Sequence, residues 1–478
     1  MAMDGYAGLD AMAQADLVKR GQATPAELAE AAIARIERLD GKLNAVVRKM
    51  YEEGRAEAGN PPAGPFRGVP FLIKDISINY KGVPTTAASK LGPLGPPQRD
   101  SELMARYRRA GLVTLGKTNL GEFGSLPTSE SAMFGPCLSP WNTETIAGGS
   151  SGGAAAAVAA RLVPVAQGGD GAGSIRIPAS CSGVYGLKPT RGRITFGPEL
   201  GEAIGGITNA HVLSWSVRDS AAVLDATEGP MPGDPYWAER PKRPYLHDVG
   251  AEPGRLRIAF TAHSMIGTKL HADCVAAVKD AAKLCESLGH VVEEAAPPLN
   301  AEEYDRIYRR FWPLIGAMGI TRGARARGQH WANPADLEPF NAWLYEQARQ
   351  INVIDYYLDL CWFHAMARDF ARFLTGYDLW LTPTLGFPPP GLGHFDAGKL
   401  GGKVVMDRFM EFLPFTPFCN MTGQPAASIP LYWNAAGLPI GVHLVGQAGD
   451  EATIFKLSGQ LERARPWAGR IPAVSALN

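Results

Sequence analysis

The chain has 478 residues, and its 47 Lys and Arg residues balance its 47 Asp and Glu residues, so the formal net charge is zero. Hydrophobic residues make up 46% of the chain and charged residues 20%, which excludes a disordered protein and fits one with a large core. The balanced charge leaves no positive surplus for nucleic acid, and no uncharged apolar stretch reaches the roughly 18 residues that a bilayer requires, so we expect neither partner.

The cysteines and the N-terminus indicate the compartment. The six cysteines are scattered and fit no disulfide framework, so we expect reduced thiols in the core. Residues 1–17 lack the basic start and the apolar run of a secretory signal. A cytoplasmic protein is the resulting prediction.

The first clear element is a helix over residues 25–39. Thr24 and Glu27 form a capping box around Pro25, which favours a helix start at this point. Further along, short apolar runs predict buried strands, and an alanine-rich run opened by glycines predicts a helix before the third of them. The strands are expected at 69–73, 112–115 and 163–166, and the helix at 152–161.

The second half of the chain begins with a strand–helix–strand pattern. A strand at 256–261, a helix at 271–288 and a strand at 291–292 predict a βαβ unit. Later strands are expected at 379–381, 427–431 and 440–445, with a last helix at 451–464. This alternation is typical of one large α/β domain with a mostly parallel sheet.

Two glycine-rich segments carry the densest chemical signal. Residues 147–153 hold Ser150 and Ser151 between glycines, and residues 170–179 hold Ser174 directly after a predicted strand. Glycines allow the backbone to approach a ligand closely, and consecutive N–H groups beside a serine are the raw material of an oxyanion hole. A phosphate-binding loop or simple tight turns are the alternatives, although neither segment matches a Walker A or a G-x-G-x-x-G pattern.

A serine nucleophile requires a base, and none of the nine histidines lies in either glycine-rich segment. A distant histidine can still be brought in by the fold. Lys74 is the other candidate, because it follows the apolar run 69–73 and burial lowers the pKa of a lysine.

Taken together, these segments resemble the amidase signature hydrolases. The matching motifs are 68–75, 116–119 with 122–123, 134–136 with Asn142, 148–153, 173–179, 186–190, 381–384, 420–426 and 441–446. The resemblance covers essentially the whole chain. It implies a single α/β/α domain over 1–478 around a central mixed, mostly parallel twisted sheet, with an N-terminal helical segment at about 1–60 and a signature core at about 65–220.

The family resemblance implies a Ser–cis-Ser–Lys triad. Matched motif by motif, the nucleophile falls on Ser174, the bridging serine on Ser150 and the base on Lys74. The Gly149–Ser150 peptide bond is expected to be cis. Lys74 would take a proton from Ser150, which takes one from Ser174, and the reversed relay would protonate the leaving amine.

The same resemblance implies the groups around the nucleophile. The oxyanion hole would be formed by the backbone N–H groups of Gly171, Ala172, Gly173 and Ser174. Relatives usually carry glycine where Ala172 stands, and alanine keeps the N–H unless the position requires a positive φ. Ser151, Asp170 and Arg176 would support the site, with a purely structural ion pair as the alternative for the last two.

The substrate pocket is expected on two segments. Ser125, Leu126, Pro127 and Thr128 match a loop that faces the substrate in relatives, and Phe415 and Cys419 match residues that often line the acyl pocket. No metal cluster and no cofactor motif is visible, so we expect neither.

Three functions compete at this point. The first is an amidase that acts on a small linear or cyclic amide or oligoamide, near the aminohexanoate-oligomer hydrolases, which residues 180–183 and 211–214 resemble. The second is the glutaminase subunit of a tRNA-dependent amidotransferase, although no arginine-rich segment for anchoring glutamine can be matched. The third is a non-catalytic scaffold, which the intact triad argues against. The oligomeric state is left open, with a homodimer as one alternative.

Overall fold

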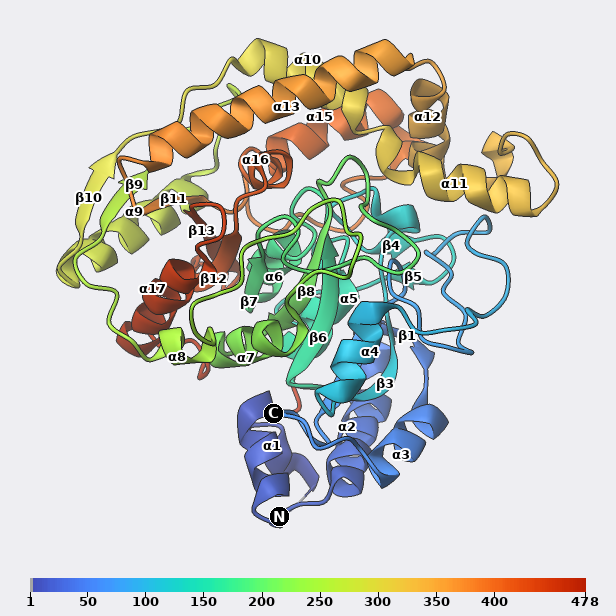
Figure 1. The fold of residues 1–478 in the computed structure, drawn as a ribbon, viewed down its shortest axis with the longest axis vertical. Coiled ribbons are helices and arrows are strands. Elements are labelled where there is room, and N and C mark those ends of the chain that lie inside the picture. Colours follow the sequence, from blue (N-terminus) through green and yellow to red (C-terminus); the bar gives the residue numbers. More distant parts are fainter. Residues whose placement is uncertain (1–2) are drawn as a thin grey trace.

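A large β-sheet crosses the middle of the structure (Figure 1). It has 11 strands in the order β1-β3-β2-β6-β8-β7-β12-β13-β11-β9-β10. The computed structural model describes residues 3–478. The strands of this sheet are β1 (Val46–Lys49), β2 (Pro70–Lys74), β3 (Val113–Thr118), β6 (Val165–Asp170), β7 (Tyr185–Lys188), β8 (Asn209–Ser214), β9 (Arg257–Phe260), β10 (Val291–Glu294), β11 (Leu379–Pro383), β12 (Ala426–Trp433) and β13 (Pro439–Gly446). A separate pair is formed by β4 (Glu130–Ser131) and β5 (Gly135–Pro136).

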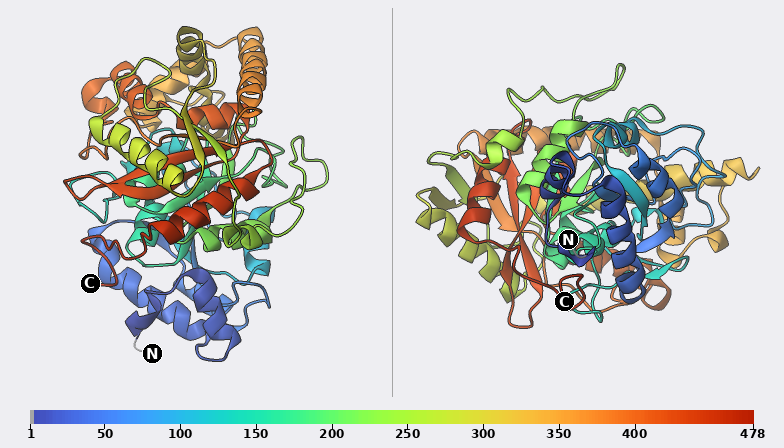
Figure 2. Two further views of the ribbon diagram at one scale, coloured as in Figure 1. Left: turned by 90° about the vertical axis from the view of Figure 1, so that its left-hand side faces the viewer. Right: turned by 90° about the horizontal axis from the view of Figure 1, so that it is seen from below.

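Helices cover both faces of the sheet and extend beyond it at two ends. They are α1 (Ala11–Lys19), α2 (Pro25–Leu39), α3 (Tyr51–Gly59), α4 (Glu102–Arg109), α5 (Gly152–Ala159), α6 (Arg176–Ser182), α7 (Val217–Thr227), α8 (Leu246–Val249), α9 (Ala272–Ser287), α10 (Ala301–Phe311), α11 (Leu314–Ala326), α12 (Pro339–Ala348), α13 (Val353–Leu374), α14 (Ala397–Leu400), α15 (Gly402–Phe412), α16 (Thr416–Thr422) and α17 (Glu451–Ala464). Both termini lie at the end formed by α1 and α2, in each view of Figures 1 and 2.

Alternation along β2 shows how the core is divided between the two faces. Phe71 and Ile73 pack in one cluster with α4, α7, α9 and α17, whereas Leu72 packs with α2 and α5 on the opposite face. Successive side chains of a strand point to opposite faces, so Lys74 follows Leu72 toward α5. The strand therefore directs the candidate base at the segment that carries Ser150.

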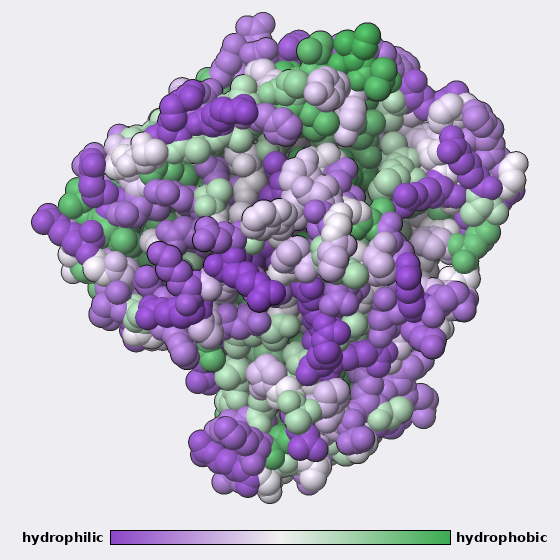
Figure 3. Space-filling view, viewed as in Figure 1, coloured by the Kyte–Doolittle hydropathy of each residue, from purple (hydrophilic) through white to green (hydrophobic). Residues whose placement is uncertain are grey.

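A third cluster lies at the other end of the molecule. It joins buried side chains of α10, α12, α13, α15 and α16 to Ala172, which follows β6. On the face seen in Figure 3, apolar side chains also gather on the outside of α13, where Val353, Ile354 and Tyr357 are exposed. This helical end packs against the loop that carries the candidate nucleophile.

The α/β class and the mixed sheet are confirmed, but the expectation of a mostly parallel sheet was wrong. Four pairings are parallel (β2–β3, β2–β6, β9–β10 and β9–β11) and six are antiparallel (β1–β3, β6–β8, β7–β8, β7–β12, β12–β13 and β11–β13). The short link between β12 and β13 closes with a hydrogen bond from Asn434 N–H to Leu438 C=O, and so tight a link permits only an antiparallel pair.

Most predicted elements are present with shifted ends. The capping box at Thr24 and the βαβ unit of β9, α9 and β10 are confirmed, and the last helix has the predicted bounds. The N-terminal segment is mostly helical but also supplies the edge strand β1, which was not predicted. A single domain over 1–478 stays a prediction.

Two further expectations can be compared with the structure. All six cysteines are free thiols; five are buried as expected, whereas Cys361 is exposed on α13. Within residues 3–478, no helix has both the length and the apolar character needed to cross a membrane.

Candidate active site

Lys74 ends β2 inside the protein and is only 2% exposed. Its Nζ atom lies 2.8 Å from Ser150 Oγ and 2.9 Å from Ser151 Oγ. Burial lowers the pKa of Lys74 to about 7, although the negative charge of Asp170 acts in the opposite direction. Near neutral pH, Lys74 is therefore uncharged in a large fraction of the protein molecules, and its amine is able to accept a proton.

Ser150 lies on the turn that leads into α5. The predicted cis bond between Gly149 and Ser150 is present. A Cβ atom on Gly149 would lie 2.5 Å from the backbone of Thr128, so only glycine fits this position. Ser129 fixes the turn, because its hydroxyl contacts the Ser150 carbonyl at 3.3 Å and accepts a hydrogen bond from the Gly152 N–H at 3.0 Å.

Ser174 lies on the loop between β6 and α6 and is 8% exposed. Within residues 3–478, no acceptor is found for the N–H groups of Gly171, Ala172 and Ser174. The N–H of Gly173 differs from the expectation, because it donates to Asp170 Oδ1 at 2.7 Å. The structure thus leaves three of the four expected donors free to bind an oxyanion.

Alanine at position 172 is compatible with this loop. The positive φ of +128° falls on Gly173, whereas Ala172 is not among the residues with positive φ. A Cβ on Gly173 would also lie 2.5 Å from Thr416 Oγ1. The glycine requirement therefore applies to position 173, and Ala172 keeps its N–H in an ordinary conformation.

Asp170 and Arg176 form a fully buried pair behind this loop. Arg176 Nε and Nη2 donate to the two carboxylate oxygens at 3.0 and 2.9 Å, and Asp170 Oδ2 also accepts from the Ile175 N–H at 3.2 Å. Burial alone raises the pKa of Asp170, but the charge and hydrogen bonds of Arg176 hold it well below its usual range. The carboxylate therefore stays ionised and binds the loop backbone.

The two serine loops are connected, although their hydroxyls are not joined directly. Ser151 N–H donates to the Ser174 carbonyl at 3.2 Å, and Ser151 Oγ donates to the Gly169 carbonyl at 3.1 Å. Between Ser150 Oγ and Ser174 Oγ, both in the described chain, there is no hydrogen bond. Catalytic hydrogen bonds often close only once substrate is bound, so this geometry is compatible with a relay.

The nine histidines all lie in the described chain, and none hydrogen-bonds to Ser150, Ser151 or Ser174. His211 is buried beside Ser220 at 3.0 Å, and burial lowers its pKa to about 3. A histidine base, the alternative that the sequence left open, has no support in this geometry.

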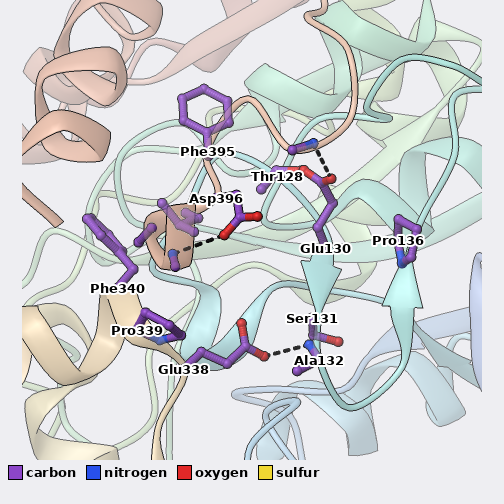
Figure 4. A pocket seen from close by; sticks show the side chains of 14 residues that line it. Thr128, Glu130, Ser131, Ala132, Pro136, Glu338, Pro339, Phe340, Phe395 and Asp396 are labelled. Atoms are coloured by element: carbon purple, nitrogen blue, oxygen red, sulfur yellow. Dashed lines mark hydrogen bonds between the residues drawn. The ribbon is translucent and has the colours of Figure 1, made fainter. Parts of the chain in front are cut away.

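A cavity of about 250 Å³ lies between the β4–β5 pair and the start of α12 (Figure 4). Leu126 and Thr128 line it, and the backbone of Thr128 abuts Gly149. Apolar side chains such as Phe340 and Phe395 alternate with three carboxylates in its wall. The carboxylates are Glu130, Glu338 and Asp396.

All three carboxylates accept hydrogen bonds from backbone N–H groups, and Asp396 accepts from that of Gly398 at 3.0 Å. Glu130 accepts from the Thr128 hydroxyl at 2.7 Å and from the Gly393 N–H at 2.8 Å. Glu338 accepts from the Ala132 N–H at 2.7 Å, as Figure 4 shows. Burial and the nearby charge of Glu122 raise the pKa of Glu338 to about 7.

The other expected pocket residues lie away from this cavity. Ser125 is buried and donates to the Glu122 carbonyl at 3.2 Å, and Pro127 is buried as well. Phe415 and Cys419 have no exposed surface, because they pack with Trp380 and other side chains in the cluster behind the Ser174 loop. Of the six expected pocket residues, Leu126 and Thr128 therefore line the cavity, whereas Ser125, Pro127, Phe415 and Cys419 do not.

Residues 27–455 match the Amidase family profile over most of the chain. The chain belongs to the amidase signature family. This amidase is 36% identical to the 6-aminohexanoate-cyclic-dimer hydrolase of Paenarthrobacter ureafaciens, over 97% of the chain and 96% of the relative. The solved structure of 6-aminohexanoate cyclic dimer hydrolase complexed with substrate superposes with a TM-score of 0.91, at 35% identity over 99% of the chain and 100% of that structure.

A second solved structure supports the same assignment. A bacterial aryl acylamidase of the amidase signature family superposes with a TM-score of 0.86, at 28% identity, over 97% of the chain and 98% of that structure. The relatives are hydrolases of amides. The chain is therefore an amidohydrolase.

Sequence reasoning assigned no role to four residues that shape the site of this amidase. Ser129 holds the Ser150 turn. Gln167 holds the backbone of Lys74, whose N–H donates to Gln167 Oε1 at 2.9 Å. Asn420 and His443 both contact Arg176. The last two lie in motifs that match the family, which was the only sequence signal for them. In the described chain, no three His, Cys, Asp or Glu residues gather in a metal-binding group.

Proposed function

We propose that this amidase hydrolyses a carboxylic amide through an acyl-enzyme on Ser174, with Ser150 and Lys74 as its proton relay. The observation that carries the proposal is the 2.8 Å contact between Ser150 Oγ and the buried amine of Lys74, whose pKa lies near 7. An uncharged lysine amine can serve as a general base, whereas an ordinary lysine is almost fully charged at neutral pH.

The proposed acylation step uses each of these groups in turn. Ser174 Oγ attacks the amide carbon while its proton passes to Ser150 Oγ and the Ser150 proton passes to Lys74 Nζ. The carbonyl oxygen gains the negative charge opposite the free N–H groups of Gly171, Ala172 and Ser174. When the C–N bond breaks, the proton returns from Lys74 through Ser150 to the leaving nitrogen.

Deacylation uses the same relay. Water attacks the ester carbon of the acyl-enzyme and gives its proton through Ser150 to Lys74. Collapse of the second tetrahedral intermediate releases the carboxylic acid and returns a proton to Ser174 Oγ. Two easier steps thus replace one difficult hydrolysis.

The substrate that we propose is a small linear or cyclic amide or oligoamide. Similarity to the 6-aminohexanoate-cyclic-dimer hydrolase over nearly the full length of both chains supports this class. A cavity of about 250 Å³ with both apolar and carboxylate lining offers room for such a molecule, and one of its lining residues, Thr128, has its backbone against Gly149, the residue before Ser150. We propose that Leu126 and Thr128 contact it there.

The test combines a substrate panel with one pair of variants. The purified chain alone should hydrolyse an aliphatic amide, an anilide or an aminohexanoate oligomer, whereas the glutaminase alternative predicts release of ammonia from glutamine only with a partner subunit. Ser174→Ala should lower kcat by about 10⁴-fold or more, because it removes the nucleophilic oxygen.

The matched control is Ser458→Ala, which removes a buried hydroxyl on α17 that receives a hydrogen bond from Tyr185. This variant should keep its activity. A fluorophosphonate should label Ser174, and peptide mapping that puts the adduct on Ser150 or Ser151 would overturn the assignment of the nucleophile.

A further inference from the structure

The carboxylate of Asp170 is the point from which the oxyanion loop is held. Its Oδ1 accepts from the Gly173 N–H, and its Oδ2 accepts from the Ile175 N–H, so the two N–H groups that flank position 174 are bound to one side chain. The free N–H groups of the loop keep their direction only as long as this carboxylate keeps its place. The contacts that hold Asp170 are therefore contacts that shape the oxyanion hole.

Asn420, on α16, uses all of its polar groups on this loop and its surroundings. It is 1% exposed. Its Nδ2 lies 2.9 Å from both the backbone carbonyl and the Oδ1 of Asp170, and 3.0 Å from the Ile207 carbonyl. Its Oδ1 accepts from Arg176 Nη2 at 2.6 Å. One neutral side chain thus contacts both members of the buried ion pair.

His443, on β13, holds the other side of Arg176. Its Nε2 lies 2.9 Å from Arg176 Nη1, and its Nδ1 lies 3.2 Å from Thr382 Oγ1. Because a guanidinium can only donate, Nε2 must be the unprotonated acceptor and Nδ1 must carry the hydrogen. The Thr382 hydroxyl donates in turn to the Pro383 carbonyl at 2.9 Å, so Thr382 Oγ1 is the acceptor for His443.

The chain of donors and acceptors is complete only with a neutral histidine. Burial and the adjacent charge of Arg176 lower the pKa of His443 well below its usual range, in agreement with this tautomer. Strands β11 and β13 are thereby connected through His443 and Arg176 to Asp170 and the loop. If His443 were protonated, its Nε2 would also carry a hydrogen, and the hydrogen bond from Arg176 Nη1 to Nε2 would be lost.

We propose that Asn420 and His443 are positioning residues, which hold the Asp170–Arg176 pair so that the N–H groups of Gly171, Ala172 and Ser174 face the oxyanion. The inference rests on the proposed function, because it needs an oxyanion at this loop. Neither residue touches the reacting atoms. Their loss should lower transition-state stabilisation and leave substrate binding nearly unchanged.

Three variants separate this role from simple packing. Asn420→Asp keeps the shape but places a carboxylate oxygen where Nδ2 now donates to Asp170. His443→Leu removes the acceptor for Arg176. His443→Gln can replace both bonds, with Oε1 accepting from Arg176 and Nε2 donating to Thr382. The matched control is His290→Leu, since His290 is a buried histidine that bridges Leu256 and Gln460 far from the loop.

Two readouts are measured on the full chain with the amide that the panel identifies and with a fluorophosphonate probe. We expect kcat and the rate of probe labelling to fall by about 10- to 100-fold in Asn420→Asp and His443→Leu, with KM within about twofold. His443→Gln should recover most of both rates. His290→Leu should lower the melting temperature but keep both rates.

The outcomes distinguish this inference from the proposed function. If folded Asn420→Asp and His443→Leu keep kcat and labelling within about twofold of the unmodified enzyme, while Ser174→Ala is inactive, the positioning role is wrong and the nucleophile stands. If Ser174→Ala stays active and labelled, the proposed function itself fails. If Asn420→Asp does not fold, the comparison of His443→Gln with His443→Leu decides. If the role of His443 were merely structural, His443→Gln would not restore kcat at an unchanged KM.

Discussion

Lys74 is the last residue of β2, and Lys117 is the last but one of the neighbouring parallel strand β3; both are almost fully buried, with 2% and 0% exposure. Burial lowers the pKa of both amines, to about 7 for Lys74 and about 8 for Lys117. Their partners differ. Lys74 contacts the hydroxyls of two serines, whereas Lys117 lies 3.3 Å from Asp75 Oδ1 and hydrogen-bonds to Thr85.

The difference shows that burial alone does not mark the base. A carboxylate stabilises the charged form of Lys117, so this lysine belongs to an ion pair. Lys74 makes no ion pair within residues 3–478 and faces hydroxyls that can deliver a proton. The strand register explains why the two lysines have different partners. Lys117 pairs with Ile73, whose side chain lies in the cluster on the opposite face of the sheet from α5.

The largest effect is expected at Lys74. Lys74→Ala should lower kcat/KM by about 10³-fold or more, because it removes the general base. Lys74→Arg should be nearly as damaging, since a guanidinium stays charged and cannot accept the proton. Steady-state kinetics on both variants, with circular dichroism as a control for folding, provide the test. An arginine variant with a rate near that of the unmodified enzyme would contradict the assignment of the base.

Lys117→Met should show the opposite pattern. It leaves Asp75 buried without its partner, which costs about 3 kcal/mol of stability, so the melting temperature should fall while kcat stays within about threefold. The double variant Lys117→Met with Asp75→Asn should recover part of the loss. Thermal unfolding and kinetics on the same samples separate the two effects, and a loss of kcat in the folded single variant would remove the distinction between the two lysines.

A smaller effect is expected at Ser151. Its hydroxyl lies 2.9 Å from Lys74 Nζ and 3.1 Å from the Gly169 carbonyl. Ser151→Ala should lower kcat/KM roughly tenfold, since one hydrogen bond that orients the amine is lost while Ser150 keeps its contact. The variant is compared with Lys74→Ala in the same assay. Equal losses in both would mean that Ser151, and not Ser150, passes the proton to Lys74.

Much of the fold was predictable because local signals agreed with it. The capping box at Thr24, the alanine-rich helix α5 and the apolar run before Lys74 each specify their element from neighbouring residues. The direction of the strands was not predictable in the same way. It depends on which strands pair, and β8 lies between β6 and β7 although β7 precedes it in the chain.

Side chains that act from a distance were the main omission in the site. The glycine-rich segments predicted the loops of Ser150 and Ser174. Asn420 and His443, which contact Arg176, lie 244 and 267 residues away from it in the sequence. The hydrogen bond from the Gly173 N–H to Asp170 also depends on a side chain that folds back onto its own loop. Such contacts require tertiary structure and leave no periodic pattern.

The most direct measurement is the pH dependence of kcat/KM in the unmodified enzyme and in Lys74→Ala, Lys117→Met and Lys188→Met. Lys188 is the closest control, because burial lowers its pKa to about 7 while its Nζ donates a hydrogen bond to the Pro189 carbonyl, at 2.8 Å, and to no serine of the described chain. Since only uncharged Lys74 can accept the proton, kcat/KM should rise with pH through an apparent pKa near 7. We expect this rise in the unmodified enzyme and in both control variants, and its absence in Lys74→Ala. The same rise in Lys74→Ala at a substantial rate, or its loss in Lys188→Met, would contradict Lys74 as the base.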